Sequence, residues 1–144
     1  MNFHRSRSWH PIGTVRSSLR DTTAAPKQGS EGAPSAWIEL DPVFAPATCG
    51  LAVGDRLILL TWLHEAQRNL LQVHPRDDLS APLKGVFATR SADRPNPVGL
   101  HPVVLLTIEG VRLQVSPLEA IDGTPVLDIK PSLPGLDALD FRQW

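Results

Sequence analysis

Short apolar-rich stretches follow one another along the chain, and polar residues, prolines and glycines separate them. Runs of this length that are rich in Val, Ile, Leu and Trp are typical of β-strands. They predict strands over the ranges 9–16, 36–40, 57–64, 70–74, 83–89, 99–109, 111–116 and 124–129. Within them, Gly13 is interpreted as a bulge and Gly110 as the turn of a hairpin. In the second strand of that hairpin, Leu113 and Val115 alternate with polar residues, which indicates one buried face.

The fold class follows from the prolines and glycines that separate these apolar stretches. The chain has 14 prolines and 10 glycines, and a proline inside a helix costs about 3 kcal/mol, so long helices are excluded. One or two helical turns are expected between Pro42 and Gly54. Seven or eight short strands at this spacing predict an all-β protein, a single antiparallel β-barrel-like domain or a sandwich, with little helix. A length of 144 residues fits one domain over residues 1–144. Residues 1–8 are expected to be a flexible arm, 17–35 a long loop and 135–144 a C-terminal tail.

Composition excludes several classes of site and location. The only cysteine, Cys49, rules out an internal disulfide and multi-cysteine metal sites, so no metal is expected. The longest mostly apolar run, Leu57–Leu63, is far too short to span a membrane. We therefore expect a cytoplasmic protein in a reducing compartment.

Charge is balanced overall but uneven along the chain. The formal net charge is −1, with 14 Lys+Arg against 15 Asp+Glu. The first twenty residues nevertheless carry four arginines and no acid: Arg5, Arg7, Arg16 and Arg20. This arm could meet phosphate groups by counterion release, or it is simply a solvated terminus.

Common catalytic motifs are missing from the sequence. There is no glycine-rich dinucleotide fingerprint, P-loop, nucleophile elbow or zinc-protease helix motif. Cys49 and His64 could act as a nucleophile pair only if the fold brought them together.

The segment with the densest polar chemistry is residues 85–100, GVFATRSADRPNPVGL. It is expected to begin as an apolar strand, and each X-Pro step then restricts the preceding residue, so Arg94 and Asn96 lie in a pre-set loop. Arg90 and Arg94 in a rigid loop would clamp an anion or a carboxylate, because guanidinium groups need fixed geometry to bind bidentately. The alternative is a structural loop whose arginines pair with Asp93 and nearby acids.

A second cluster lies at residues 119–131, EAIDGTPVLDIKP. Asp122-Gly123 is a strong turn signal, and its amides and carboxylate suit a ribose or an amino group of a ligand. The alternative is an ordinary turn followed by a surface pair of Asp128 and Lys130. A third cluster, WLHE, places His64 at a strand end, where a histidine is either a hydrogen-bonded structural residue or a base.

In their order along the chain, PIGTVRSS, PKQG, WLHEA, GVFATRSADRPNPVGLHPV and AIDGTPVLDIKP resemble the TrmO (TsaA-like) family of S-adenosylmethionine-dependent tRNA methyltransferases. The resemblance runs from Pro11 to about Pro134, and the chain looks like a short, single-domain branch. It implies one antiparallel β-barrel-type domain that acts as a homodimer. The implied reaction methylates the exocyclic nitrogen of threonylcarbamoyl-adenosine, next to the anticodon of tRNA.

The resemblance also implies roles for residues at matching motif positions. The implied contacts to S-adenosyl-L-methionine are Pro26, Lys27, Gln28, His64, Glu65, Arg90, Leu100, Asp122, Gly123, Thr124 and Pro125. The residues implied to shape the pocket or to hold substrate are Arg94, Asn96, Asp128 and Lys130. Candidates to accept the proton released on methyl transfer are His64, Asp122 and Asp128, and the sequence does not choose between them.

Two other functions remain open from the sequence. The same barrel could methylate a small molecule, which would require a closed apolar pocket beside the methyl group. It could also bind S-adenosylmethionine as a non-catalytic or regulatory module.

Overall fold

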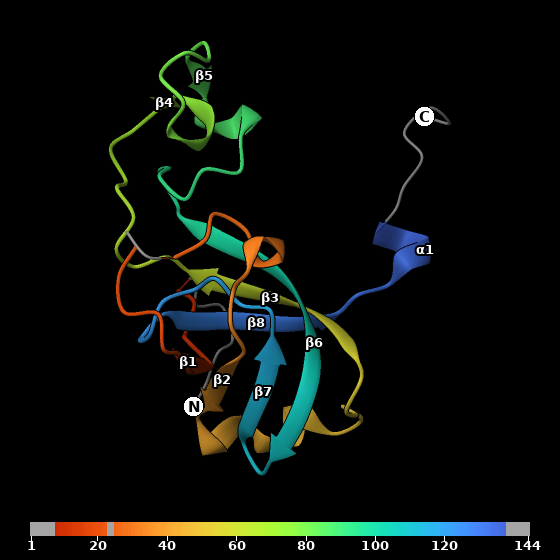
Figure 1. Cartoon of the computed structure of the whole chain (residues 1–144). Helices are drawn as coiled ribbons and strands as arrows, with labels where there is room; N and C mark the ends of the chain where they lie inside the picture. The colour runs from red at the N-terminus through yellow and green to blue at the C-terminus, as the bar shows by residue number, and fades with distance from the viewer. Residues whose placement is uncertain (1–7, 23–24, 138–144) are drawn as a thin grey trace.

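The fold is known from a computed structural model, which describes residues 8–22 and 25–137 (Figure 1). Its strands are β1 Gly13–Arg16, β2 Ala36–Leu40, β3 Arg56–Trp62, β4 Gln72–Val73, β5 Lys84–Gly85, β6 Val98–Glu109, β7 Arg112–Ser116 and β8 Pro125–Pro131. The helical segments are one-turn or short 3-10 helices and a terminal turn: η1 Gly29–Glu31, η2 Pro42–Thr48, η3 Pro75–Asp77, η4 Val86–Ala88 and α1 Pro134–Asp137. The prediction of an all-β protein with little helix is confirmed.

Six of the strands form a closed barrel in the order β1-β2-β7-β6-β3-β8. Every neighbouring pair in this ring is antiparallel, including the closing pair of β1 and β8. Closure leaves no unpaired edge in the ring. The two remaining strands, β4 and β5, form a separate two-stranded sheet outside the barrel.

The core lies inside the barrel and comes from every second residue of the strands. On β6, for example, Val103 and Leu105 are buried, whereas the intervening Val104 and Leu106 are exposed. Thirteen buried residues make one continuous cluster: Val15, Ala36, Ile38, Leu40, Leu57, Leu59, Val103, Leu105, Leu113, Val115, Leu118, Ala120 and Val126. Burying apolar area at roughly 25 cal/mol per Å² makes this cluster the main stabilising feature.

Most predicted strands lie where the sequence placed them, with two corrections. Residues 86–88 form the 3-10 turn η4 instead of a strand, and in it only Val86 is buried. The first strand starts at Gly13, and the pairing of β1 with β2 is regular there, so Gly13 is not a bulge. A Cβ on Gly13 would lie 2.5 Å from the Glu39 carbonyl oxygen, so glycine lets the two strands approach closely. The register shifts instead lie between Leu60 and Thr61 on β3 and between Leu105 and Thr107 on β6.

The ring order places three long connections at one end of the barrel. Because all neighbours are antiparallel, β1, β3 and β7 end where β2, β6 and β8 begin. We call these segments the first (17–35), second (63–97) and third (117–124) connections, and we call this end of the barrel the loop end. The second connection carries the β4–β5 sheet and extends away from the barrel (Figure 1).

The third connection closes the loop end. In the ring of six, β7 and β8 lie opposite each other, so the chain between them must cross the opening. Leu118, Ala120 and Ile121 in this connection are buried, and Leu118 and Ala120 belong to the core cluster. Across the described residues, no helix is long and apolar enough to cross a lipid bilayer.

Replacing Leu59 by alanine should remove a fully buried side chain from the centre of β3. We expect the free energy of unfolding to fall by about 2–5 kcal/mol, because lost burial and a residual cavity add together. Urea denaturation measures this free energy of unfolding. Leu79→Ala, at a side chain that is 81% exposed, is the control and should change it by less than about 0.5 kcal/mol. Equal effects of the two changes would contradict the assignment of the core.

Candidate functional site

Most of the motif residues that the sequence singled out lie in the three connections at the loop end. Pro26, Lys27 and Gln28 lie in the first connection, and His64, Glu65, Arg90, Arg94 and Asn96 lie in the second. Asp122, Gly123 and Thr124 close the third connection, and Pro125 begins β8. Arg90 and Asp122, about 30 residues apart in sequence, therefore emerge from the same end of the barrel.

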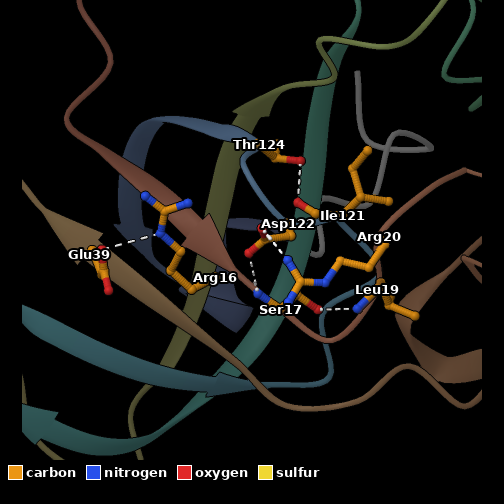
Figure 2. A network of polar contacts seen from close by, with 8 residues as sticks. All are labelled: Arg16, Ser17, Leu19, Arg20, Glu39, Ile121, Asp122 and Thr124. Atoms are coloured by element: carbon orange, nitrogen blue, oxygen red, sulfur yellow. Dashed lines mark hydrogen bonds and ion pairs between the residues drawn. The ribbon is translucent and has the colours of Figure 1, made fainter.

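Asp122 fastens the third connection to the start of the first (Figure 2). One carboxylate oxygen, Oδ1, accepts from the Ser17 backbone N–H at 3.0 Å, and Oδ2 pairs with the Arg20 guanidinium at 2.9 Å. Its own backbone N–H donates to the Leu19 carbonyl at 2.7 Å. Gly123 has a φ of +86°, a conformation that glycine adopts without strain. The turn is therefore held rigidly before any ligand arrives.

Thr124 continues the same network. Its buried hydroxyl donates to the Ile121 carbonyl at 2.7 Å (Figure 2). Its backbone carbonyl accepts from the Val15 backbone N–H at 2.9 Å. Nearby, Arg16 of β1 pairs with Glu39 of β2. Of the four arginines in the predicted basic arm, Arg16 and Arg20 are thus neutralised by acids, and Arg5 and Arg7 lie outside the described residues.

Ion pairs join the first connection to the second. Lys27 pairs with Asp77, and Glu31 pairs with Arg76, so both pairs link η3 to η1 or to the residues just before it. Next to them, the hydroxyl and backbone N–H of Ser80 donate to Asp78 Oδ1 at 2.6 and 2.9 Å. These hydrogen bonds lower the pKa of the Asp78 carboxyl. The Lys27–Asp77 and Glu31–Arg76 pairs are largely exposed, so each contributes little stability, but they show that the PKQG segment lies beside η3.

Arg94 braces the second connection from within. Its Nη2 donates to the carbonyl oxygens of Val86 and Thr89, and its backbone N–H donates to the Gln67 carbonyl. Asp93 accepts from the Gln67 backbone N–H at 2.8 Å. The expectation that Arg94 clamps a ligand anion therefore competes with an observed structural role, and that role uses backbone carbonyls instead of the acids considered from the sequence.

Three predicted cofactor contacts in the second connection are exposed: His64, Glu65 and Arg90. Of the three proton-acceptor candidates, Asp122 is already bound to Arg20, and Asp128 pairs with Lys130 at 3.1 Å. Asp128 lies opposite Leu60 and Lys130 opposite Ile58, on the outer wall of the barrel. Leu100 also faces outward from β6 and is 45% exposed. These three wall residues are set apart from the connections that carry the other candidates.

A buried polar chain at the loop end was not anticipated from the sequence. His101 of β6 is 3% exposed, and its Nδ1–H donates to Glu119 Oε1 at 2.6 Å. Its other ring nitrogen, Nε2, lies 2.7 Å from the hydroxyl of Thr61 on β3. A Cβ on Gly99 would lie within 2.5 Å of both Thr61 Oγ1 and His101 Nε2, so only glycine leaves room for this contact.

The polar chain ties the third connection to the barrel wall. Glu119 Oε2 faces the first connection, 3.0 Å from where a Cβ on Gly29 would stand. A signal was present in the sequence, since His101 occupies an inward position of the alternating strand 99–109.

Cys49 and His64 do not form a pair. Cys49 directly follows η2 in the segment between β2 and β3, at the end of the barrel opposite the loop end. It lines a hollow of about 390 Å³ together with Arg56, Leu57, Pro131 and Ser132, among others. A smaller hollow of about 250 Å³ lies at the loop end and is lined by Phe87, Arg94, Pro95, Asn96 and Val98. Neither is a closed apolar pocket of the kind a small-molecule acceptor would require.

Among the described residues, no group of three or more His, Cys, Asp or Glu side chains could hold a metal ion.

Comparison with known proteins places the chain in a family. The family model described as the tRNA-methyltransferase O N-terminal domain matches residues 14–138. A probable S-adenosyl-L-methionine-binding protein of Methanothermobacter thermautotrophicus is 43% identical over 131 residues, covering 91% of this chain and 93% of the relative. An S-adenosyl-L-methionine-binding protein of Archaeoglobus fulgidus is 37% identical over 130 residues, covering 90% of this chain and 92% of the relative.

Solved structures agree with this assignment. The crystal structure of TrmO from Pseudomonas aeruginosa superposes with a TM-score of 0.74 at 37% identity. The match covers 94% of this chain and 60% of the TrmO chain, so the present chain spans about three fifths of that protein.

Replacing His101 by alanine should leave the Thr61 hydroxyl and the Glu119 carboxylate without their partner. We expect the free energy of unfolding to fall by about 1–3 kcal/mol, the usual cost of unsatisfied buried polar groups. Glu119→Gln keeps an oxygen that can accept from Nδ1–H and should cost only about 1 kcal/mol. Both values come from urea denaturation, and a His101→Ala protein as stable as the wild type would rule out the anchoring role.

Proposed function

The chain belongs to the tRNA-methyltransferase O (TrmO) family of S-adenosyl-L-methionine-dependent methyltransferases, and from this premise we propose that it methylates the exocyclic nitrogen of threonylcarbamoyl-adenosine next to the anticodon of tRNA. The observation that carries the proposal is the convergence of the family's motifs at one end of a closed barrel. Three connections that are far apart in sequence deliver them there, and hydrogen bonds and ion pairs hold these connections together.

The chemistry of the loop end fits S-adenosyl-L-methionine. The methionine part of this cofactor carries a carboxylate and an ammonium group, and its nucleoside part carries ribose hydroxyls. An exposed guanidinium at Arg90 complements the carboxylate, and the Glu65 carboxylate complements the ammonium group or the hydroxyls. The N–H groups of Asp122 and Gly123 already donate to the Leu19 and Val15 carbonyls, so the rigid turn would meet the cofactor through its carbonyl oxygens. When bound, the cofactor supplies an electrophilic methyl group on its sulfonium.

The protein's contribution to such a reaction is mainly positioning. Holding two reactants at about 3–3.5 Å in the right orientation replaces a bimolecular encounter, which accounts for a large part of the barrier. The cross-links of Asp122 to Ser17 and Arg20 suit this task because they fix the turn in advance. The acceptor nitrogen must also lose a proton. We assign its removal to His64, because Asp122 and Asp128 are already engaged by cations.

The experiment that tests the function measures cofactor and substrate together. Isothermal calorimetry with S-adenosyl-L-methionine measures binding. Mass spectrometry of the nucleosides of bulk tRNA, incubated with enzyme and cofactor, detects a new methylated threonylcarbamoyl-adenosine. Cofactor binding without any new methylated nucleoside would favour a small-molecule acceptor or a non-catalytic module.

Replacing Arg90 by alanine should weaken cofactor binding about 10- to 150-fold in calorimetry. This is the range expected when hydrogen bonds to a charged group, worth about 1.5–3 kcal/mol, are lost. The matched control is Arg56→Ala, an exposed arginine at the start of β3, where β3 is farthest from the loop end. It should leave the affinity unchanged, and an unchanged affinity in Arg90→Ala would overturn the proposed contact.

We further propose that the chain forms a homodimer through the outer face of β6. Leu100, Val104 and Leu106 lie on this face, and each is between 36% and 45% exposed. A row of aliphatic side chains along one long strand is a continuous apolar patch, and such patches mark protein interfaces.

Replacing Leu106 by aspartate should therefore convert a dimer into a monomer, since a charge cannot be buried unpaired at an apolar interface. Sedimentation velocity measures the mass in solution. Leu79→Asp, in the second connection at a side chain that is 81% exposed, is the control and should remain dimeric. A wild-type protein that sediments as a monomer would overturn the dimer.

A further inference from the structure

We propose that a largely exposed strip beside the loop end, in which only Trp62 is half-buried, holds unpaired bases of single-stranded RNA next to the reacting nucleotide. The strip consists of Trp9, Trp62, Arg68, Asn96 and Phe87, and we call it the stacking strip. The inference rests on the proposed function, because it names the part of the surface that recognises an RNA acceptor. None of these five residues except Asn96 was a candidate from the sequence.

The strip begins with two stacked rings on the barrel wall. Trp62 faces outward at the end of β3, and its ring centroid lies 4.9 Å from that of Trp9, with an interplanar angle of 34°. Trp9 is 53% exposed. The guanidinium of Arg68 lies 5.0 Å from the centroid of the Trp62 ring, within the range of a cation–π contact.

Hydrogen bonds hold the Arg68 guanidinium in place. Its Nε donates to the Pro95 carbonyl at 2.7 Å, and its Nη2 donates to Asn96 Oδ1 at 3.2 Å. Planes of guanidinium groups and aromatic rings are the surfaces on which proteins stack unpaired RNA bases. Because Asn96 accepts through its oxygen, its amide N–H groups remain the donors that can face an acceptor on the edge of a base.

Phe87 completes the strip on the far side of Asn96. It is 88% exposed, and it borders the hollow of about 250 Å³ that Arg94, Pro95, Asn96 and Val98 also line. The backbone that carries the ring is fixed, because its neighbour Val86 is buried and Arg94 binds the carbonyl oxygens of Val86 and Thr89. An exposed aromatic ring beside a hollow is a ready partner for a planar base.

The near-neutral charge of the chain favours RNA binding by base stacking over binding by a broad basic surface. The formal net charge of the chain is −1, and Arg16 and Arg20 are paired with acids. Affinity for RNA must then come from a local surface that combines rings with a cation, as in single-strand binding sites. The stacking strip also adjoins the candidate site, since Trp62 precedes His64 by two residues and Phe87 precedes Arg90 by three.

The test uses fluorescence anisotropy with a labelled, unstructured RNA of about ten nucleotides, within the size range of single-domain sites. Phe87→Ala and Arg68→Ala should each weaken binding about 5- to 150-fold, the loss expected for one stacked base. Unlabelled single-stranded RNA should compete well, and the same RNA annealed to its complement should compete poorly, because paired bases cannot stack on the strip.

Matched controls come from elsewhere on the molecule. Arg112 lies 4.4 Å from the Trp37 ring, a second Arg–Trp pair, on β7 and β2, which carry no residue of the stacking strip. Arg112→Ala and Leu79→Ala should leave RNA binding unchanged. Phe87→Ala and Arg68→Ala proteins that bind RNA as tightly as the wild type, or a duplex that competes equally, would overturn the stacking strip.

The same variants separate this inference from the proposed function. If the wild type methylates bulk tRNA and Phe87→Ala methylates it at the same rate and KM, the stacking strip is wrong and the function stands. If the wild type binds S-adenosyl-L-methionine but neither binds nor methylates RNA, both are wrong. A raised KM for tRNA in Phe87→Ala, with cofactor affinity unchanged, supports both.

Discussion

The closure of six antiparallel strands into a ring is the constraint on which the rest of this molecule depends. In such a ring, strand directions alternate, so every connection emerges at one of two ends. The order β1-β2-β7-β6-β3-β8 sends the three long connections to the same end. Motif residues from position 26 to position 125 thereby emerge at the same end of the barrel, although no single element carries them. The crossing from β7 to β8 also plugs this end with Leu118 and Ala120, so the base of the site is part of the core.

The fold could be predicted largely from the sequence because its signals are local. Apolar runs bounded by proline and glycine marked all six barrel strands, and Gly110, with a φ of +61°, turns the β6–β7 hairpin as expected. The two incorrect predictions, at residues 86–88 and at Gly13, arose because tertiary contacts decide the structure there. The apolar run 86–88 reads as a strand, but only Val86 has a core to enter, and Arg94 binds the backbone carbonyls that a neighbouring strand would have used. At Gly13 the close approach of β2, which no local pattern reveals, explains the glycine.

The candidate site was predictable as a set of segments but not as a set of contacts. Motif resemblance located the three connections, yet it could not show that Asp122 is already bound by Ser17 and Arg20, or that Asp128 and Lys130 face outward. The polar chain runs from Thr61 through His101, 40 positions later, to Glu119, 18 positions further on. The register of β3 and β6 brings the first two together, and the crossing of the third connection brings Glu119 to them. The sequence gives one signal of this polar chain, a histidine at an inward strand position, and that signal can be interpreted only when Thr61 and Glu119 are known to be its partners.

The same geometry explains how a nearly neutral barrel could serve an RNA substrate. Most arginines in the described part of the chain are committed, for example Arg16 and Arg20 to acids, Arg94 to backbone carbonyls, and Arg68 to Pro95 and Asn96. Committed guanidinium groups contribute little long-range attraction, but they are fixed in orientation, and orientation is what a stacked base or a bound carboxylate requires. The second connection supplies this rigidity near the stacking strip, and the first and third supply it at the Asp122 turn. Recognition at the loop end would then depend on fixed local surfaces instead of a basic field, which is consistent with a formal charge of −1.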